Sequence, residues 1–343
     1  MNIEDSVNWF VNRLISPENY NIAPPITADN LIQNIDEDNI YKAIISSKFR
    51  KTKITPETEI DIRYKIHSSV VNKEAIHFSI PFGAYKAWRL ELGFAPDWAE
   101  VFNVAYLMEY ATHIIKVYPY GVHFHYTYQG GIMYCISDTP KEKAENYYVI
   151  FKEILGLFNK LSNKVKFDLV DISSLYSSKE EYYIDFLHNF LDNLIDWDSK
   201  YDIATRNRHF LSAMHNVYLY GNRNLANQTE YIKGKYYFFS ALMTDAVDCL
   251  SERRLYNKNS NNIQLVCVKG PSKCINIGAC ETSTVHFWVG RGFLRKNKGT
   301  LKPYIYTYSN VVQIISDEAT IEILVESPFN KLNSNLQKIL YLP

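Results

Sequence analysis

Residues 75–100 read Ala-Ile-His-Phe-Ser-Ile-Pro-Phe-Gly-Ala-Tyr-Lys-Ala-Trp-Arg-Leu-Glu-Leu-Gly-Phe-Ala-Pro-Asp-Trp-Ala-Glu, and this stretch decides the fold. Apolar and polar residues alternate over 75–81, which predicts a strand. A loop follows, and Pro96 then opens a helix that we expect to run to about residue 116. Asp97 and Glu100 are three residues apart, the spacing of a capping box at a helix start. The stretch therefore predicts a strand, a loop and a helix.

A second strand is predicted over Val122–Tyr128, because apolar and polar residues alternate strictly there. His123 and His125 share the polar face of this strand. Gln129-Gly130-Gly131 is a turn sequence, and residues 132–137 are predicted to return as the second strand of a hairpin.

The remaining chain alternates between helical and strand patterns. Residues 1–65 are predicted to form a helical N-terminal region packed on the core, and residues 66–343 the core domain. Further helices are predicted over residues 27–34, 37–50, 141–161, 179–195, 203–218 and 230–250. Further strands are predicted over residues 165–172, 263–268, 274–278, 284–290 and 304–308. This pattern favours an α/β fold with a mixed, Rossmann-like β-sheet flanked by helices.

Composition narrows the class of protein. The 343 residues contain 37 Lys and Arg against 37 Asp and Glu, so we expect neither a nucleic-acid nor a membrane partner. The N-terminus lacks a signal-peptide core and no apolar run approaches 18 residues, which predicts a cytoplasmic protein. The five cysteines form no CxxC pair and are expected to be reduced thiols. No cofactor is predicted.

Lys86 and Arg89 lie in the predicted loop between a strand and a helix. Ligands of α/β folds bind beyond strand ends and near helix starts, so these two cations could clamp a phosphate or carboxylate. The alternative is a solvated pair in an ordinary loop. Asp97 is adequately explained as a helix cap, but a carboxylate at this position could also bind a substrate amine.

His123 and His125 admit three interpretations. Two histidines that are two residues apart on a strand can bind one metal ion, but no third ligand follows at a short interval, so no metal is predicted. A histidine-ligated metalloenzyme stays as a further hypothesis, in which a distant residue would complete the site. Either histidine could instead transfer protons, because the pKa of imidazole lies near neutrality. Both could also simply occupy a half-exposed strand face.

A third group of polar residues falls within 278–292, which is rich in glycine. Its hydroxyls and backbone N–H groups could cradle an anion, and its histidine could transfer protons. An ordinary turn followed by a buried strand is the alternative. The sequence is neither GxGxxG nor a Walker loop. The candidate residues are Thr282, Ser283, Thr284, His286 and Arg291.

Residues 80–148 resemble the isocyanide (isonitrile) synthase family in the order of their motifs. These are Pro81-Phe82, Lys86, Pro96-Asp97-Trp98-Ala99-Glu100, and Tyr118-Pro119-Tyr120-Gly121 before a strand. One departure is Tyr128-Gln129-Gly130-Gly131, where the family has Ser-Asp-Gly. The resemblance implies an enzyme that joins the amino group of an L-amino acid to ribulose 5-phosphate, whose carbon becomes the isonitrile carbon.

The leading hypothesis is therefore an enzyme for a small phosphorylated or carboxylated substrate. Lys86, Arg89, Arg291 and the Thr282–Thr284 turn would act as clamps, and His123, His125 or His286 would transfer protons. The alternative is a non-catalytic ligand-binding or host-interaction protein on the same scaffold.

Overall fold

The structure is a computed structural model. It describes residues 2–20, 35–83, 86, 92–128, 141–171, 174, 177–178, 181, 203, 207, 261–268, 273–307, 310–311, 313–314 and 320–343. Arg89 lies outside the described residues. The helices predicted over 27–34 and 230–250 also lie outside them. Of the helices predicted over 179–195 and 203–218, only single positions are described. No helix in the described ranges has the length and apolar character needed to cross a bilayer.

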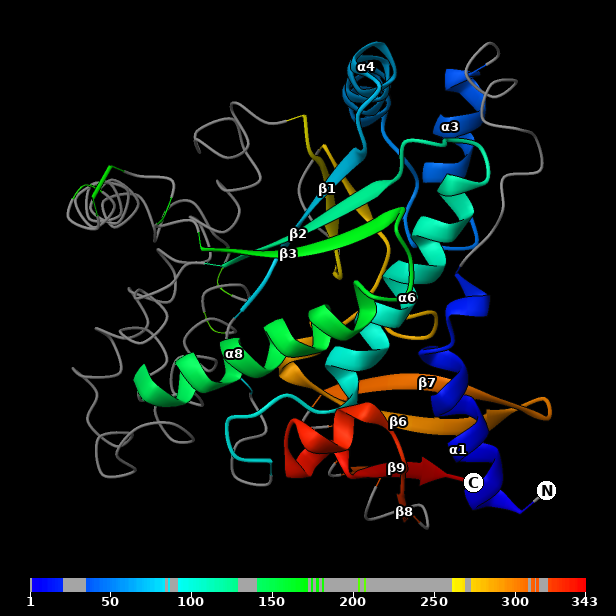
Figure 1. The fold of residues 1–343 in the computed structure, drawn as a ribbon, viewed down its shortest axis with the longest axis vertical. Coiled ribbons are helices and arrows are strands. Elements are labelled where there is room, and N and C mark those ends of the chain that lie inside the picture. The colour runs from blue at the N-terminus through cyan, green and yellow to red at the C-terminus, as the bar shows by residue number, and fades with distance from the viewer. Residues whose placement is uncertain are drawn as a thin grey trace. The chain divides into compact units, whose positions relative to one another are not determined.

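Five strands form one parallel sheet in the order β3-β2-β1-β4-β5 (Figure 1). Their bounds are β1 (Ile76–Pro81), β2 (Val122–Tyr128), β3 (Val165–Asp171), β4 (Ile263–Val266) and β5 (Cys274–Asn276). The chain adds β2 and β3 on one side of β1, then β4 and β5 on the other. This reversal makes a switch point beside β1, the usual place for ligands in folds of this kind. The predicted α/β class is confirmed.

β2 lies between β1 and β3 in this sheet. The expected hairpin would have made residues 132–137 its neighbour, but both neighbouring positions belong to parallel strands. Residues 132–137 themselves lie outside the described ranges.

Two helices, α6 (Trp98–Ile115) and α8 (Lys141–Phe158), cover one face of β1, β2 and β3. Tyr110 of α6 packs on Phe78 and Phe124, with ring centroids 5.5 and 6.4 Å apart. Residues of α6 are buried almost all around the helix, because the N-terminal helices and the second sheet also pack on it. α6 therefore contacts the parallel sheet, the N-terminal helices and the second sheet.

The N-terminal region is helical, as predicted. Its helices are α1 (Ile3–Leu14), α3 (Glu37–Ile44) and α4 (Pro56–Asn72). Each begins at a polar residue whose side chain accepts a hydrogen bond from the first turn, namely Asn2, Asp36 and Thr55. The hydroxyl of Tyr110 donates to the Ile44 carbonyl at 2.8 Å, which fastens α3 to α6.

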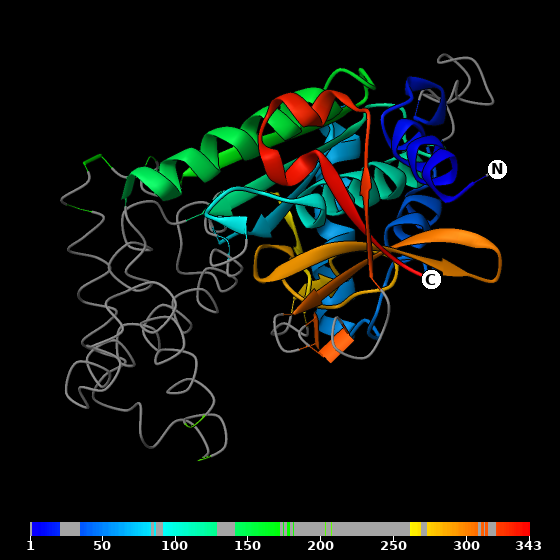
Figure 2. The ribbon, with the colours of Figure 1, turned by 90° about the horizontal axis from the view of Figure 1, so that it is seen from below.

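A second sheet of four strands has the order β7-β6-β9-β8. Its strands are β6 (Gly290–Asn297), β7 (Thr300–Thr307), β8 (Ile321–Leu324) and β9 (Lys338–Leu342). β6 and β7 form the long orange hairpin of Figures 1 and 2. Lys298 and Gly299 both have positive φ, 47° and 84°, as a tight two-residue hairpin turn requires.

The strand predicted over 284–290 is wrong. The chain forms a single 3-10 turn, η4 (Phe287–Val289), and β6 begins only at Gly290. Phe287 and Trp288 are both buried there, and a strand would have pointed these consecutive side chains to opposite faces. The strand expected at 304–308 is confirmed as part of β7.

The chain divides into two compact units. The first comprises Met1–Tyr126, Tyr147–Leu169 and Asn261–Pro343, and the second comprises Thr127–Asn146 and Val170–Ser260. The sites discussed below are built from residues of the first unit.

Gly292 lets β6 lie against the first turn of α6. A Cβ atom at this position would lie 2.5 Å from the Ala99 nitrogen and 2.5 Å from the Trp98 carbonyl carbon. Both are backbone atoms and cannot rotate away, so the strand and helix approach each other this closely only because residue 292 has no side chain.

We predict that Gly292→Ala lowers the free energy of unfolding by about 1–3 kcal/mol, because the added methyl overpacks this contact. Gly156→Ala in α8 is the matched control, since nothing lies within 4 Å of its Cβ position. That change should be neutral or stabilise by up to about 1 kcal/mol. Urea denaturation measures both, and equal effects would contradict the close approach.

Candidate functional site

Lys86 lies just beyond the end of β1 and binds two carboxylates. Its Nζ is 2.7 Å from Asp97 Oδ1, and 2.8 and 2.9 Å from the two oxygens of Glu100. The Phe287 carbonyl accepts a longer hydrogen bond from the same Nζ at 3.4 Å. Lys86 and Glu100 are fully buried and Asp97 is nearly so. The Lys86 cluster, defined as Lys86, Asp97, Glu100 and Tyr147, thus occupies the switch point of the sheet.

The two carboxylates are held by the start of α6. Asp97 is the N-cap and Glu100 reaches back to the Asp97 backbone N–H at 2.8 Å, which confirms the predicted capping box. Tyr147 of α8 donates to Glu100 Oε1 at 2.7 Å, and the Gly292 backbone N–H donates to Asp97 Oδ2 at 3.2 Å. One ion cluster therefore joins β1, α6, α8 and β6.

Burial and the neighbouring groups shift the pKa values of the two carboxyl groups in opposite directions. Burial is the largest influence on Glu100 and raises its pKa to about 8, although Lys86 acts in the opposite direction. Burial also acts to raise the pKa of Asp97, but Lys86 and the hydrogen bonds outweigh it and hold the pKa below its ordinary value. The pKa of Tyr147 is raised by burial and by Glu100, so its hydroxyl keeps its proton. At neutral pH the cluster is then close to electrically neutral.

Aromatic side chains wall the cluster. Phe82 stacks on Phe287 with centroids 5.6 Å apart, and Trp288 lies over the backbone of Gly83. His286 stacks on Trp288 at 4.3 Å. Burial lowers the pKa of His286 to about 4, and its Nδ1 has no hydrogen-bond partner among the described residues. His286 is therefore a neutral imidazole with an available nitrogen.

The polar residues of the 278–292 segment do not join the Lys86 cluster as a group. Thr282 Oγ1 donates to the Pro303 carbonyl at 2.5 Å, and Ser283 Oγ accepts from the Ile305 N–H at 2.9 Å. These hydroxyls fasten the turn to β7. Thr284 is exposed, and Arg291 is half-buried on β6, next to the Gly292 N–H that contacts Asp97.

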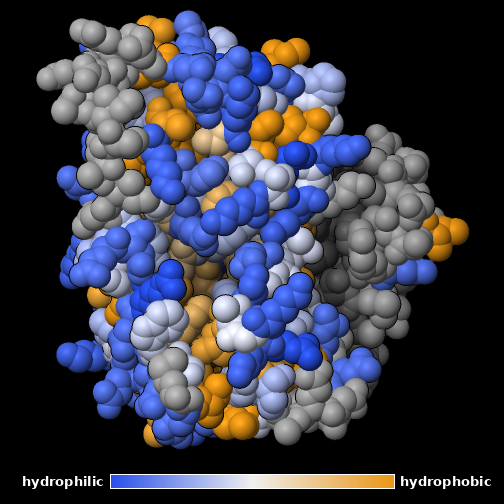
Figure 3. Space-filling view, turned by 90° about the vertical axis from the view of Figure 1, so that its right-hand side faces the viewer, coloured by the Kyte–Doolittle hydropathy of each residue, from blue (hydrophilic) through white to orange (hydrophobic). Residues whose placement is uncertain are grey.

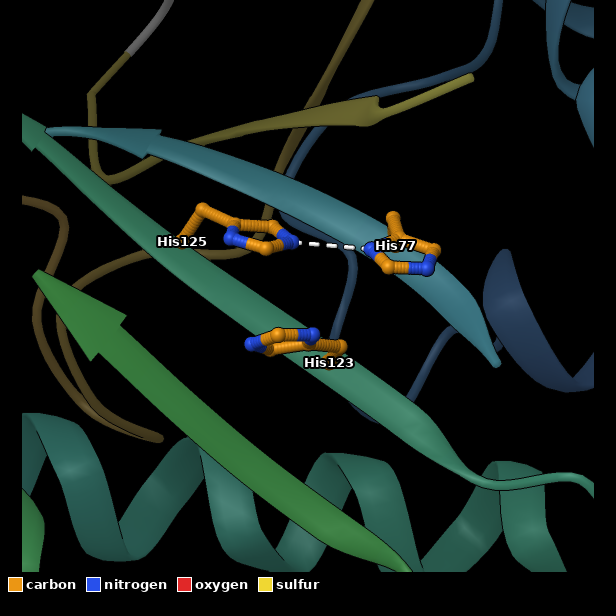
Figure 4. A group of neighbouring side chains, drawn as sticks. All are labelled: His77, His123 and His125. Carbon is orange, nitrogen blue, oxygen red and sulfur yellow. Dashed lines mark hydrogen bonds between the residues drawn. The ribbon is translucent and has the colours of Figure 1, made fainter. Parts of the chain in front are cut away.

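Three histidines gather on the opposite face of β1 and β2 (Figure 4). His77 comes from β1, whereas His123 and His125 come from β2. One ring nitrogen from each lies within 4.8 Å of the others. His77 Nδ1 is hydrogen-bonded to His125 Nε2 at 2.8 Å. Asp168 of β3 lies beside them, with its Oδ2 2.6 Å from His123 Nε2.

Burial is the main cause that lowers the pKa of all three histidines, and it lowers that of His125 to about 3. Neighbouring imidazoles add to the effect at His123 and His125, while Asp168 opposes it. The three rings are therefore neutral at physiological pH and are poor proton donors.

A recess of about 650 Å³ lies away from both clusters. It is bordered by α1, α6 and the β6–β7 hairpin, with Trp9, Phe102 and Tyr106 among its apolar residues and Arg13 and Lys302 among its cations. Figure 3 views the side of the molecule that carries α1, where hydrophilic side chains surround patches of apolar surface. None of the predicted site residues lines this recess.

Sequence reasoning missed three participants. Tyr147 was not singled out in the helix predicted over 141–161, and Asp168 was assigned only as a residue of a strand. His77 was assigned only to the polar side of its strand. Its place beside His123 and His125 required knowing that β1 and β2 are neighbours. The strand–helix–strand pattern over residues 76–128 is the signal in the sequence that could have predicted this adjacency, because such a unit usually places its two strands side by side and parallel.

Comparisons with known proteins support the fold. No family model matches the chain, and no curated protein matches it. Among solved structures, the PvcA protein from Pseudomonas aeruginosa is similar with a TM-score of 0.54. The two chains are 13% identical, and the match covers 90% of this chain and 99% of PvcA. At 13% identity this likeness shows a common fold. As a likeness of fold, it supports the distant resemblance found in residues 80–148.

The pKa of Glu100 predicts a specific pH dependence of stability. Folding raises this pKa from 4.5 to about 8, so between these values the folded chain holds a proton that the unfolded chain has released. Stability contributed by Glu100 should therefore fall as pH rises. The histidines whose pKa values are lowered act in the opposite direction, chiefly below their unfolded pKa of 6.5; these are His77, His113, His123, His125 and His286. The range from about pH 6.5 to 8 thus isolates Glu100.

In that range we expect the free energy of unfolding of the wild type to fall more steeply than that of Glu100→Gln, by at most about 1.4 kcal/mol per pH unit. Glu322→Gln, at an exposed ion pair, should keep the wild-type slope. Urea denaturation across pH measures all three proteins. Parallel curves for wild type and Glu100→Gln would show that Glu100 is ionised throughout.

Proposed function

We propose that the chain is an enzyme that acts on a small anionic substrate at the Lys86 cluster, with chemistry like that of isocyanide synthases. The observation that carries this proposal is the convergence of the family-like motifs. β1 ends at Pro81, Lys86 follows it, and Asp97 and Glu100 lie at the start of α6, yet the three charged side chains meet within 2.9 Å. The similarity in fold to PvcA supports only the part of the proposal that concerns the fold.

Glu100 is the residue best suited to proton transfer. A carboxyl group with a pKa of about 8 is mostly protonated at neutral pH, and a catalytic acid or base works best when its pKa lies near the working pH. Tyr147 holds this carboxyl group in place through its hydrogen bond to Glu100 Oε1. In the proposed reaction, Glu100 would act first as an acid and, once deprotonated, would accept a proton from the substrate amine.

Lys86 is the proposed anion-binding group, with Arg89 as a further candidate from the sequence. A guanidinium binds a phosphate or carboxylate through two parallel hydrogen bonds, which fixes the orientation of the substrate. Arg291 has no role in this proposal, because Gly292 faces the first turn of α6 and neighbouring residues of a strand point to opposite faces. His123, His125 and the Thr282–Thr284 turn, which were also predicted as site residues, have no role in this proposal.

A non-catalytic binding protein is the second candidate, and one observation favours it. Lys86 is fully buried and its Nζ already contacts three carboxylate oxygens. A buried ion cluster of this kind can serve the fold alone, because removing one partner leaves an uncompensated buried charge. The two candidates differ in whether the protein turns substrate over.

The test incubates the purified full-length chain with ribulose 5-phosphate and each L-amino acid in turn. Mass spectrometry follows the gain of one carbon and loss of two hydrogens that converts an amine to an isonitrile. We expect turnover by the wild type and a loss of roughly 100-fold or more in Glu100→Gln, since general acid–base groups contribute at least that much. Glu322→Gln is the matched control and should retain full activity.

Binding of ribulose 5-phosphate or an amino acid without any turnover would favour the second candidate. Equal turnover by wild type and Glu100→Gln would remove Glu100 from the mechanism. Circular dichroism of each variant establishes that it is folded.

A further inference from the structure

The three histidines on β1 and β2 lie where a single cation could bind all of them. We propose that His77, His123 and His125 form a binding site for a divalent transition-metal ion of the zinc class. The site lies on the face of the sheet opposite Phe78 and Phe124, which pack under α6. It therefore goes beyond the function proposed for the Lys86 cluster and stands without it.

The distances between ring nitrogens fit a shared ion. One nitrogen from each ring lies within 4.8 Å of the others. Two ligands bound tetrahedrally at about 2.0–2.1 Å are roughly 3.3 Å apart. His77 Nδ1 and His125 Nε2 are now 2.8 Å apart and face each other across a hydrogen bond. Replacing the shared proton with a metal ion requires these rings to separate by only about half an ångström.

The backbone positions of the ligands are fixed by the sheet. His123 and His125 are two residues apart on β2, so strand geometry points both to the same face. His77 projects from the neighbouring strand toward them, and its ring lies edge to edge with that of His125, nearly parallel to it and with centroids 5.2 Å apart. A metal would therefore need rotations of side chains and no movement of strands.

Asp168 supplies the negative charge that such a site needs. Its Oδ2 is 2.6 Å from His123 Nε2 and 3.9 Å from His125 Nδ1. His123 Nε2 is enclosed, yet it makes no well-aligned hydrogen bond with any described residue, Asp168 included. Lys166 is also near Asp168, at 3.7 Å, but its side chain is mostly exposed and can turn to solvent.

The donor set selects the class of metal. Imidazole nitrogens suit zinc, copper, nickel and iron, whereas magnesium and calcium prefer an all-oxygen shell. Neutral imidazoles are the form that binds metal. Three protein nitrogens with one further position for water give the four-coordinate geometry typical of zinc, and Asp168 is the supporting carboxylate.

The test strips the purified full-length protein with a chelator and titrates it with Zn²⁺ and with Co²⁺. We expect about one ion per chain by calorimetry and by elemental analysis after gel filtration. Co²⁺ should give the visible absorption of a tetrahedral site with nitrogen ligands. Asp168→Asn should weaken Zn²⁺ binding about 10- to 100-fold, as loss of a supporting carboxylate does in other metal sites.

His123→Asn and His125→Asn should abolish binding, whereas His67→Asn should not. His67 is an exposed histidine paired with Glu37 on the N-terminal helices, so it controls for adventitious surface binding. Binding well below one ion per chain, or equal binding by the His123→Asn and His67→Asn variants, overturns the proposal. Because the Co²⁺ spectrum needs no substitution, the proposal stays testable if a variant fails to fold.

Discussion

The Lys86 ammonium is the constraint on which the arrangement of this unit depends. A buried charge without partners is very unfavourable, so the chain must bring anionic groups to it. Asp97 and Glu100 do so from the start of α6, Tyr147 adds a hydroxyl from α8, and the Gly292 N–H reaches the cluster from β6. The parallel sheet and the second sheet therefore meet at one set of polar contacts. Gly292 has no side chain because β6 must come this close to α6.

Alternation along β1 and β2 separates two chemical environments. Phe78 and Phe124 face α6 and contribute to the core, whereas His77, His123 and His125 face the other way. Since successive residues of a strand point to opposite faces, both environments are fixed by the same register. A shift by one residue would place imidazoles in the core and phenyl rings beside Asp168.

Local features of the sequence predicted local structure well. The capping box at Asp97 and the alternation over Val122–Tyr128 are each complete within a few residues, and both are confirmed. The gathering of side chains into clusters was not predictable in the same way, because it depends on which strands are neighbours. The expected strand over 284–290 failed since the need to bury consecutive aromatic residues outweighed strand preference.

The protonation of Glu100 bears on how Lys86 could serve a substrate. With Asp97 ionised and Glu100 neutral, Lys86 is balanced by a single negative charge, and the cluster avoids the larger desolvation cost of a second buried anion. Glu100 is then the partner that Lys86 can exchange most readily, because separating an ammonium from a neutral carboxyl costs less than separating it from a carboxylate. An incoming anion would take the place of Glu100 and leave Asp97 bound. In the proposed function, the proton on Glu100 would weaken the attraction between Glu100 and Lys86.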